Sequence, residues 1–175
     1  MVLLSSQKPR EMIKKLTRRD AETIYGIINK AAKVYCGAIP DDCYHEPYMP
    51  IEELRAEIRS MTFFGWQENG RLVGVMGFQP VKDVTLIRHA YVLPESQGKG
   101  IGSGLLNHLR QMTTSRQLLV GTWRDATWAV QFYQRRGFTM RPDKDSLLKR
   151  YWNISQRQIE TSVVLGIELA WPKII

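Results

Sequence analysis

The chain has 175 residues, of which 43% are hydrophobic and 24% charged, a composition that suits one globular domain over residues 1–175 and excludes a disordered protein. No apolar run approaches the roughly 20 residues of a membrane helix, and Val2-Leu3-Leu4 is too short for a signal peptide, so we expect no membrane association and a cytoplasmic location. The formal charge of +8 suits either a nucleic acid or a small ligand with several phosphates as the partner.

The first third of the chain predicts a short strand over residues 13–16 and two helices. Thr17-x-x-Asp20 resembles a capping box with Asp in place of the usual Glu, and it precedes a helix that runs to about Tyr35. A loop over residues 37–48, rich in turn formers and acidic groups, follows. Pro50 suits the first position of a second helix, over residues 51–61.

The middle of the chain predicts three strands that pair as a meander. Asn69-Gly70 is a strong signal for a two-residue hairpin turn. The expected strands are 62–68, 72–79 and 84–92, and a helix with Leu105, Leu106, Leu109 and Met112 on one face follows a glycine-rich turn.

The last part alternates strands and helices. We expect strands over residues 118–122, 138–141 and 161–169, a helix over 126–136 that ends at Gly137, and a short helix over 145–150. A meander followed by such alternation predicts an α+β or mixed-sheet α/β domain.

The turn between residues 92 and 103 carries three alternating glycines, Gly98, Gly100 and Gly102. Without Cβ atoms, its backbone N–H groups can converge on an anion at the positive end of the following helix, which favours a pyrophosphate. Lys99 is followed by Gly100, so the turn is not a P-loop, and Ser103 stands where a dinucleotide fingerprint needs glycine.

Two motifs together resemble the GNAT superfamily of N-acetyltransferases. Gln97-x-x-Gly100-x-Gly102, preceded by Tyr91-Val92-x-Pro94, is similar to that family's acetyl-CoA pyrophosphate loop. About thirty residues later, Ala129-x-x-Phe132-Tyr133-x-x-x-Gly137-Phe138 is similar to its second helix motif. The resemblance covers nearly the whole chain.

The resemblance implies the GNAT acyl-CoA N-acyltransferase fold, a mixed, mostly antiparallel sheet flanked by helices. Its fourth and fifth strands would splay apart to admit the pantetheine arm, and the amides from Gly98 to Ser103 would hold the pyrophosphate. Lys99 is either a charged phosphate contact or a solvated loop lysine. The cofactor-binding residues implied are Tyr91, Val92, Gln97, Gly98, Lys99, Gly100, Ile101, Gly102 and Ser103.

The activity implied is transfer of an acetyl group from acetyl-CoA to a primary amine by direct attack in a ternary complex. Tyr133 matches the family tyrosine that protonates the leaving thiolate as general acid, and its alternative is a packing role. His89 is a candidate general base, three positions before Val92, and is equally consistent with a structural histidine. A backbone N–H near Val92 would stabilise the oxyanion.

The sequence leaves the acceptor open, with a small-molecule amine favoured over a protein N-terminus. Acidic and polar residues of the first loop are candidates to attract a cationic amine, and aromatic residues nearby to form the rim of its pocket. These residues are Asp41, Asp42, Tyr44, His45, Glu46 and Tyr48, with Trp123, Trp128, Tyr151 and Trp152 as further candidates that also suit core packing. Ala126 stands where many relatives carry Asn, so contacts made by that Asn would be absent or replaced by Arg124 or Asp125.

Cys36 and Cys43 are the only cysteines, and their spacing predicts two free thiols and no metal site. A CoA-binding regulator without turnover is an alternative, although it would lack the catalytic tyrosine. A nucleic-acid-binding protein is disfavoured because no basic stripe with interleaved aromatics is present. A homodimer is compatible with the resemblance, since relatives often form dimers.

Overall fold

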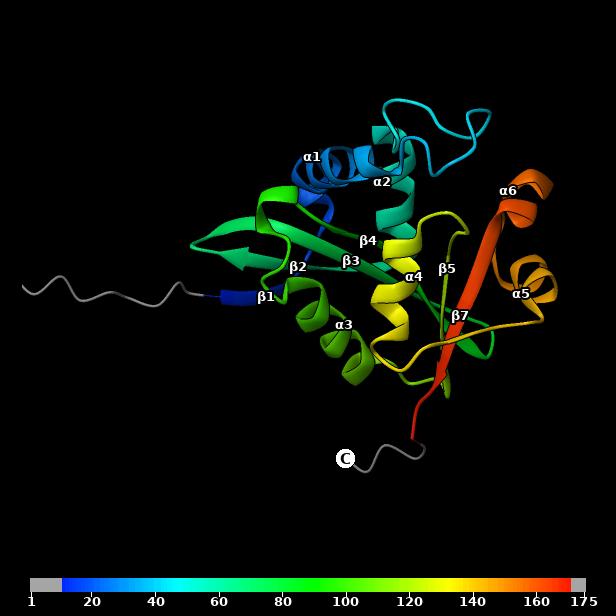
Figure 1. Ribbon diagram of the computed structural model, residues 1–175. Coiled ribbons are helices and arrows are strands. Elements are labelled where there is room, and N and C mark those ends of the chain that lie inside the picture. Colours follow the sequence, from blue (N-terminus) through cyan, green and yellow to red (C-terminus); the bar gives the residue numbers. More distant parts are fainter. Residues whose placement is uncertain (1–10, 171–175) are drawn as a thin grey trace, which may run out of the picture.

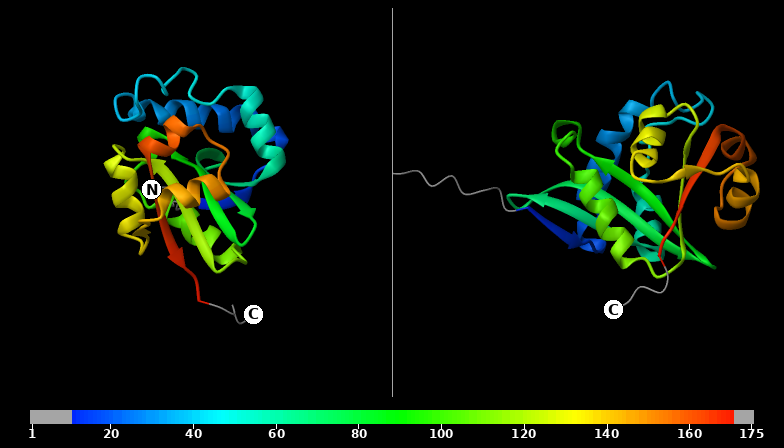
Figure 2. Two further views of the ribbon diagram at one scale, coloured as in Figure 1. Left: turned by 90° about the vertical axis from the view of Figure 1, so that its right-hand side faces the viewer. Right: turned by 60° about the horizontal axis from the view of Figure 1, so that its bottom comes forward.

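The computed structural model describes residues 11–170, which form a seven-stranded sheet with helices on both faces (Figures 1 and 2). The strand order is β1-β2-β3-β4-β5-β7-β6, and β4 and β5 are the only parallel neighbours among these strands. The mixed, mostly antiparallel sheet that was expected is confirmed. The strands are β1 (Glu11–Lys15), β2 (Thr62–Glu68), β3 (Arg71–Val81), β4 (Val84–Val92), β5 (Gln117–Trp123), β6 (Thr139–Met140) and β7 (Ser162–Glu168).

Side chains that alternate along β2 show how the helices divide between the two faces of the sheet. The Phe64 ring packs edge-on against His108 of α3, with ring centroids 4.4 Å apart. The neighbouring Phe63 ring stacks on His89, which approaches Glu57 of α2 from the opposite face. The helices are α1 (Ala21–Ala31), α2 (Ile51–Ser60), α3 (Ile101–Met112), α4 (Thr127–Gln134), α5 (Lys144–Tyr151) and α6 (Gln156–Thr161).

The parallel pair β4 and β5 separates halfway along β4. Register partners run only from Val84 with Gln117 to Ile87 with Val120. Beyond that point β5 stays with β7, whereas β4 stays with β3 across a register shift between Val75 and Gly77. His89 lies in this irregular stretch with φ +51°, and such a bulge bends the strand locally. The expected gap between the fourth and fifth strands is therefore present.

Two local signals gave the expected structure. Thr17 and Asp20 form a reciprocal capping box, although it caps the short 3-10 turn Arg18–Asp20 that precedes α1. Asn69 and Gly70 both have positive φ, 50° and 81°, as a two-residue hairpin turn requires.

Several element boundaries differ from the expectation. The first helix ends as an α-helix at Ala31 and continues as the 3-10 segment η2 (Ala32–Tyr35). Pro50 is the N-cap of α2 and not its first residue. The last strand begins at Ser162, because the residues before it form α6, a helix that was not expected. Ser155 is the N-cap of α6, and its side chain accepts a hydrogen bond from Gln158 N. None of the helices within residues 11–170 is long and apolar enough to cross a bilayer.

Candidate active site

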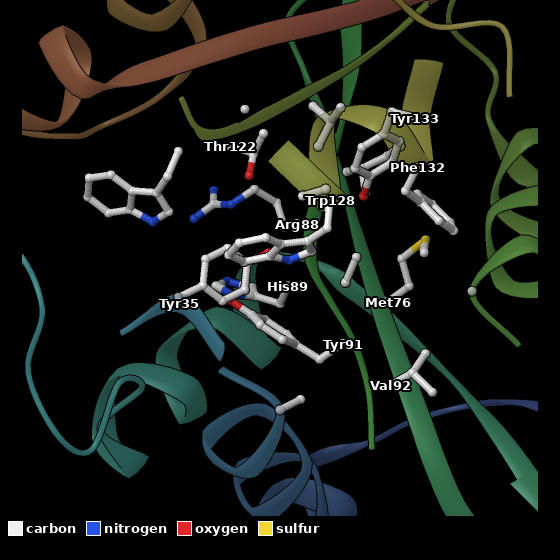
Figure 3. Close-up of a pocket in the computed structure, with 18 of the residues that line it drawn as sticks. Tyr35, Met76, Arg88, His89, Tyr91, Val92, Thr122, Trp128, Phe132 and Tyr133 are labelled. Carbon is white, nitrogen blue, oxygen red and sulfur yellow. The ribbon is translucent and has the colours of Figure 1, made fainter. Parts of the chain in front are cut away.

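A cavity of about 620 Å³ opens where β4 and β5 diverge (Figure 3). It is lined by both strands, the N-terminus of α3, one face of α4 and the segment around η2. Most of the residues that the sequence singled out for cofactor binding and catalysis line it. They are His89, Tyr91, Val92, Gln97, Gly98, Gly100, Ile101, Gly102, Ser103 and Tyr133.

The glycine-rich turn presents bare backbone to this cavity. Gly98 and Gly100 have φ of 76° and 82°, which L side chains rarely adopt, and a Cβ on either would meet nothing within 4 Å. Gly100 is the N-cap of α3 and provides no side chain to cap the first turn of the helix. The amide groups of that turn and the helix dipole are therefore available to an anion.

Gly102 has a packing role in the same turn. A Cβ there would lie 3.1 Å from the Phe132 ring of α4. Glycine thus lets the first turn of α3 lie close against α4, where the two helices border the cavity together.

The side chains of Gln97 and Lys99 each contact another part of the protein. Gln97 Nε2 donates to the carbonyl of Val92 at 3.1 Å, which joins the turn to the end of β4. Lys99 does not line the cavity, and its Nζ lies 3.9 Å from Glu68 Oε2 of β2. In this structure the Lys99 side chain is therefore a solvated loop lysine, while its backbone remains part of the turn.

Arg136 brings a positive charge to the start of α3, a contact that was not expected. Its Nε donates to Ser103 Oγ at 2.9 Å, its NH1 donates to the Phe132 carbonyl at 2.7 Å, and its guanidinium lies 3.7 Å from the Phe132 ring centroid. Both Arg135 and Arg136 line the cavity. The basic pair in the sequence is visible, but its position beside α3 depends on how α4 packs.

Tyr133 of α4 is buried, and its ring packs edge-on against Phe132 and Phe138. No hydrogen bond from another residue in the 11–170 region occupies its hydroxyl. Burial raises the pKa of Tyr133 and the nearby Tyr35 adds to this, while Arg136 lowers it in part. The hydroxyl therefore stays protonated throughout the neutral range and is available as a proton donor.

His89 forms a close pair with Glu57, a residue of α2 that the sequence did not indicate. His89 Nε2 is buried and lies 3.5 Å from Glu57 Oε2, while Arg88 NH2 donates to Glu57 Oε1 at 3.3 Å. Burial alone would raise the pKa of Glu57, but the His89 contact and the Arg88 charge outweigh it, so the pKa lies below its ordinary value. A charged carboxylate thus faces one ring nitrogen of His89, a residue that lines the cavity.

Aromatic rings form the far end of the cavity. Tyr35 contacts three other rings of this group, with its centroid 5.3–6.3 Å from the centroids of Trp128, Tyr48 and Tyr91. In Figure 3, Tyr133 and Phe132 lie toward one end of the cavity and Tyr35 and Arg88 toward the other. Of the other aromatic candidates, Trp123 and Trp152 also line the cavity, whereas Tyr44 and Tyr151 do not.

The acidic residues of the first loop do not line the cavity. Asp42 pairs with Arg157 of α6 through two hydrogen bonds of 2.9 and 3.3 Å, and Glu46 accepts from the Tyr44 hydroxyl at 3.0 Å. The loop is thereby fastened to α6 and does not direct its carboxylates toward an acceptor. Among residues 11–170, no group of three or more His, Cys, Asp or Glu side chains is placed to hold a metal ion.

Ala126, which stands where many relatives have Asn, is fully buried at the N-cap of α4 beside Ile39 and Trp123. Neither Arg124 nor Asp125 lines the cavity, and Arg124 donates to the carbonyl of Glu160 instead. The replacement of the Asn contacts by either residue is therefore not supported.

Comparison with known proteins agrees with this geometry. Residues 24–138, more than half of the chain, match the model of the acetyltransferase (GNAT) family. A search among curated protein sequences gives no match.

Solved structures share the fold at low sequence identity. The PaiA N-acetyltransferase of Thermoplasma acidophilum, in complex with coenzyme A, is 18% identical with a TM-score of 0.72, over 91% of this chain and 99% of that one. An N-acetyltransferase of Staphylococcus aureus Mu50 is 18% identical with a TM-score of 0.65, over 91% and 98%. The ribosomal-protein-S18-alanine N-acetyltransferase of Escherichia coli is 17% identical with a TM-score of 0.58, over 95% and 99%. The chain belongs to the GNAT family of acetyltransferases and is an acyltransferase.

Proposed function

We propose that this protein transfers the acetyl group of acetyl-CoA to the nitrogen of a small primary amine, by direct attack while both substrates are bound. One observation carries the proposal. A single cavity is lined by the uncapped glycine turn at α3, by Tyr133 and by His89, whose ring pairs with Glu57.

The glycine turn fits the pyrophosphate of coenzyme A. Its positive-φ glycines leave open space, and the start of α3 provides free amide groups and the positive end of the helix dipole. Arg135 and Arg136 add two guanidinium groups to this end of the cavity. The gap beyond Ile87 and Val120 leaves the backbone of Tyr91 and Val92 for the pantetheine arm. The coenzyme A bound to the Thermoplasma relative is consistent with this assignment.

Tyr133 is the proposed general acid for the departing thiolate. With reference pKa values of about 10 for tyrosine and 8.5 for a thiol, the transfer is uphill by roughly 2 kcal/mol. Burial raises the pKa of Tyr133, and the same dry surroundings raise the pKa of a leaving thiol, so the two shifts offset each other.

His89 is the proposed base for the amine. A lysine-like amine with a pKa of about 10.4 must lose a proton, which costs about 4–5 kcal/mol at neutral pH. The charged carboxylate of Glu57 stabilises the imidazolium that forms when His89 accepts this proton. A backbone N–H near Val92 is the proposed oxyanion donor.

The proposal also includes expectations about the domain organisation, the cellular location and the oligomeric state. The single sheet supports one catalytic domain across the chain, while a cytoplasmic location and a homodimer remain predictions. Fractionation of cells and light scattering of the purified protein test them.

The test is to mix the purified protein with acetyl-CoA and a panel of amines while following thiol release, and to weigh the product by mass spectrometry. We expect release that depends on the amine and a product heavier by one acetyl group. Binding of acetyl-CoA, seen as a raised melting temperature, without release on any amine would contradict the proposal and favour a CoA-binding regulator.

A further inference from the structure

The end of the cavity away from the glycine turn is walled by aromatic rings from separate parts of the chain. Tyr35 comes from η2, Tyr91 from β4 and Trp128 from α4. The ring centroid of Tyr35 lies 6.2 Å from that of Tyr91 and 5.3 Å from that of Trp128. The Trp152 ring also lines the cavity, and it covers the β5 backbone so closely that a Cβ on Gly121 would lie 3.4 Å from it. Flat apolar surfaces from four parts of the chain thus line this end of the cavity.

The mouth of this end also exposes apolar surface. Trp128 is 40% exposed and Val34 is 55% exposed, and both line the cavity. Large apolar side chains in the core of a protein are normally covered, and a concave patch of exposed apolar side chains marks a site for a ligand. These side chains therefore form part of a ligand-binding surface and are not only core packing.

The charges along the walls exclude strongly charged acceptors. Within the part of the chain that the structure describes, no Asp or Glu lines the cavity. A polyamine would find no carboxylate for its additional ammonium groups. Arg88, the cation at this end, already forms an ion pair with Glu57, and Arg88 NH1 donates to Gln79 Oε1 at 3.1 Å. An acidic acceptor would have to displace this pair.

We propose, on the basis of the acetyltransferase function above, that the acceptor is an aromatic primary amine without a further charged group. Its ring lies between the walls formed by Tyr35, Trp128 and Trp152, and its amine reaches toward His89. Aromatic side chains prefer to bind flat apolar rings through offset or edge-on contacts, which the arrangement around Tyr35 already shows. The reaction forms an N–C bond to the acetyl carbonyl carbon, breaks the C–S bond, and sends the amine proton to His89 and a proton from Tyr133 to the thiolate.

The test compares kcat/KM at saturating acetyl-CoA for four groups of amines. Phenethylamine and tryptamine carry a ring and one amine, whereas phenylalanine and tryptophan add a carboxylate. Putrescine and spermidine are polycations, and a short peptide with an N-terminal alanine represents a protein acceptor. We expect kcat/KM for the aromatic amines to exceed that of every other group by at least tenfold.

A variant localises the effect. Trp128→Leu should raise KM for phenethylamine at least fivefold and leave KM for acetyl-CoA unchanged. Met112→Ala is the matched control, because Met112 is 48% exposed at the end of α3 and does not line the cavity. Equal KM values for phenethylamine in the wild-type protein and Trp128→Leu would overturn the placement of the ring.

A binding experiment separates this inference from the proposed function. Phenethylamine is titrated by calorimetry into the protein saturated with coenzyme A, which needs no turnover. Turnover of putrescine, spermidine or the peptide in preference to aromatic amines would overturn the inference and leave the acetyltransferase proposal intact. Binding of phenethylamine without turnover would support the inference and contradict the proposed function. If aromatic amines are neither bound nor acetylated, the inference is overturned.

Discussion

Nε2 of His89 lies 3.5 Å from Oε2 of Glu57, across the interface between β4 and α2. His89 adopts φ +51° in the bulge of β4, and its ring is stacked on Phe63 with an interplanar angle of 15°. Backbone strain at a cavity wall, together with a partly buried carboxylate beside the ring, is typical of residues in functional sites.

His89→Asn should lower kcat by at least tenfold in a protein that still folds. Asparagine tolerates a positive φ better than most residues, so the variant removes the imidazole without adding backbone strain. General base catalysis typically contributes about 10²–10⁴-fold. The measurement is kcat of the wild-type protein and the variant, compared over a range of pH. Wild-type kcat in His89→Asn would remove His89 from the mechanism.

Glu57 should make stability depend on pH in the acidic range. Its pKa in the folded protein lies below its unfolded value of about 4.3, so its stabilisation is present above that value and is lost as pH falls through the lowered pKa. We expect Glu57→Gln to be less stable than wild type at pH 7 by about 1–3 kcal/mol. Thermal melts from pH 7 to pH 3 test this, since the difference should shrink below about pH 4. A difference that is constant with pH would contradict the account.

Tyr133→Phe should reduce kcat at least tenfold with little change in stability or in KM for acetyl-CoA. The substitution removes a hydroxyl that makes no hydrogen bond within residues 11–170 and keeps the ring contacts with Phe132 and Phe138. Tyr151→Phe is the matched control, because that hydroxyl donates to Asp83 at 2.8 Å and lies outside the cavity. Tyr151→Phe should therefore keep full activity. An equal loss of activity in both variants would argue that Tyr133 only packs.

Two glycines in helices should respond to alanine in opposite directions. In α1, a Cβ on Gly26 meets nothing within 4 Å, so Gly26→Ala should stabilise by about 0.5–1 kcal/mol through the lower entropy of the unfolded chain. In α3, a Cβ on Gly104 would lie 2.3 Å from the Trp66 ring, so Gly104→Ala should destabilise by about 1–3 kcal/mol. Urea unfolding measures both changes. Destabilisation by both variants would show that helix propensity does not govern α1.

The parts of the site that the sequence predicted are those encoded locally. The glycine turn, with its strand before and its helix after, lies within about twelve residues, and the motif around Tyr133 follows one helical face. The turn could be assigned because backbone conformation depends on neighbouring residues, and the motif around Tyr133 was assigned from its resemblance to the GNAT family.

Features formed by distant residues could not be predicted in the same way. Glu57 and His89 are 32 positions apart, and in the sequence Glu57 resembles any solvated residue of a charged helix. The bulge at His89 has no glycine or proline to signal it. The ring cluster around Tyr35 combines η2, β4 and α4, whose meeting depends on the splay of the sheet. Among the α-helices and strands of residues 11–170, only α6 was missed, although Ser155 as its N-cap is a sequence signal for its start.

Direct transfer in a ternary complex is the central claim, because one cavity is bordered by the glycine turn and by the residues proposed to hold the amine. Cys36 and Cys43 both lie outside the lining, so neither thiol is placed to carry the acetyl group. The decisive measurement is a set of initial rates with acetyl-CoA and amine varied together. The account predicts intersecting double-reciprocal lines and no CoA release before the amine is added. Parallel lines with a burst of CoA in the absence of amine would contradict it, because they indicate an acetylated enzyme.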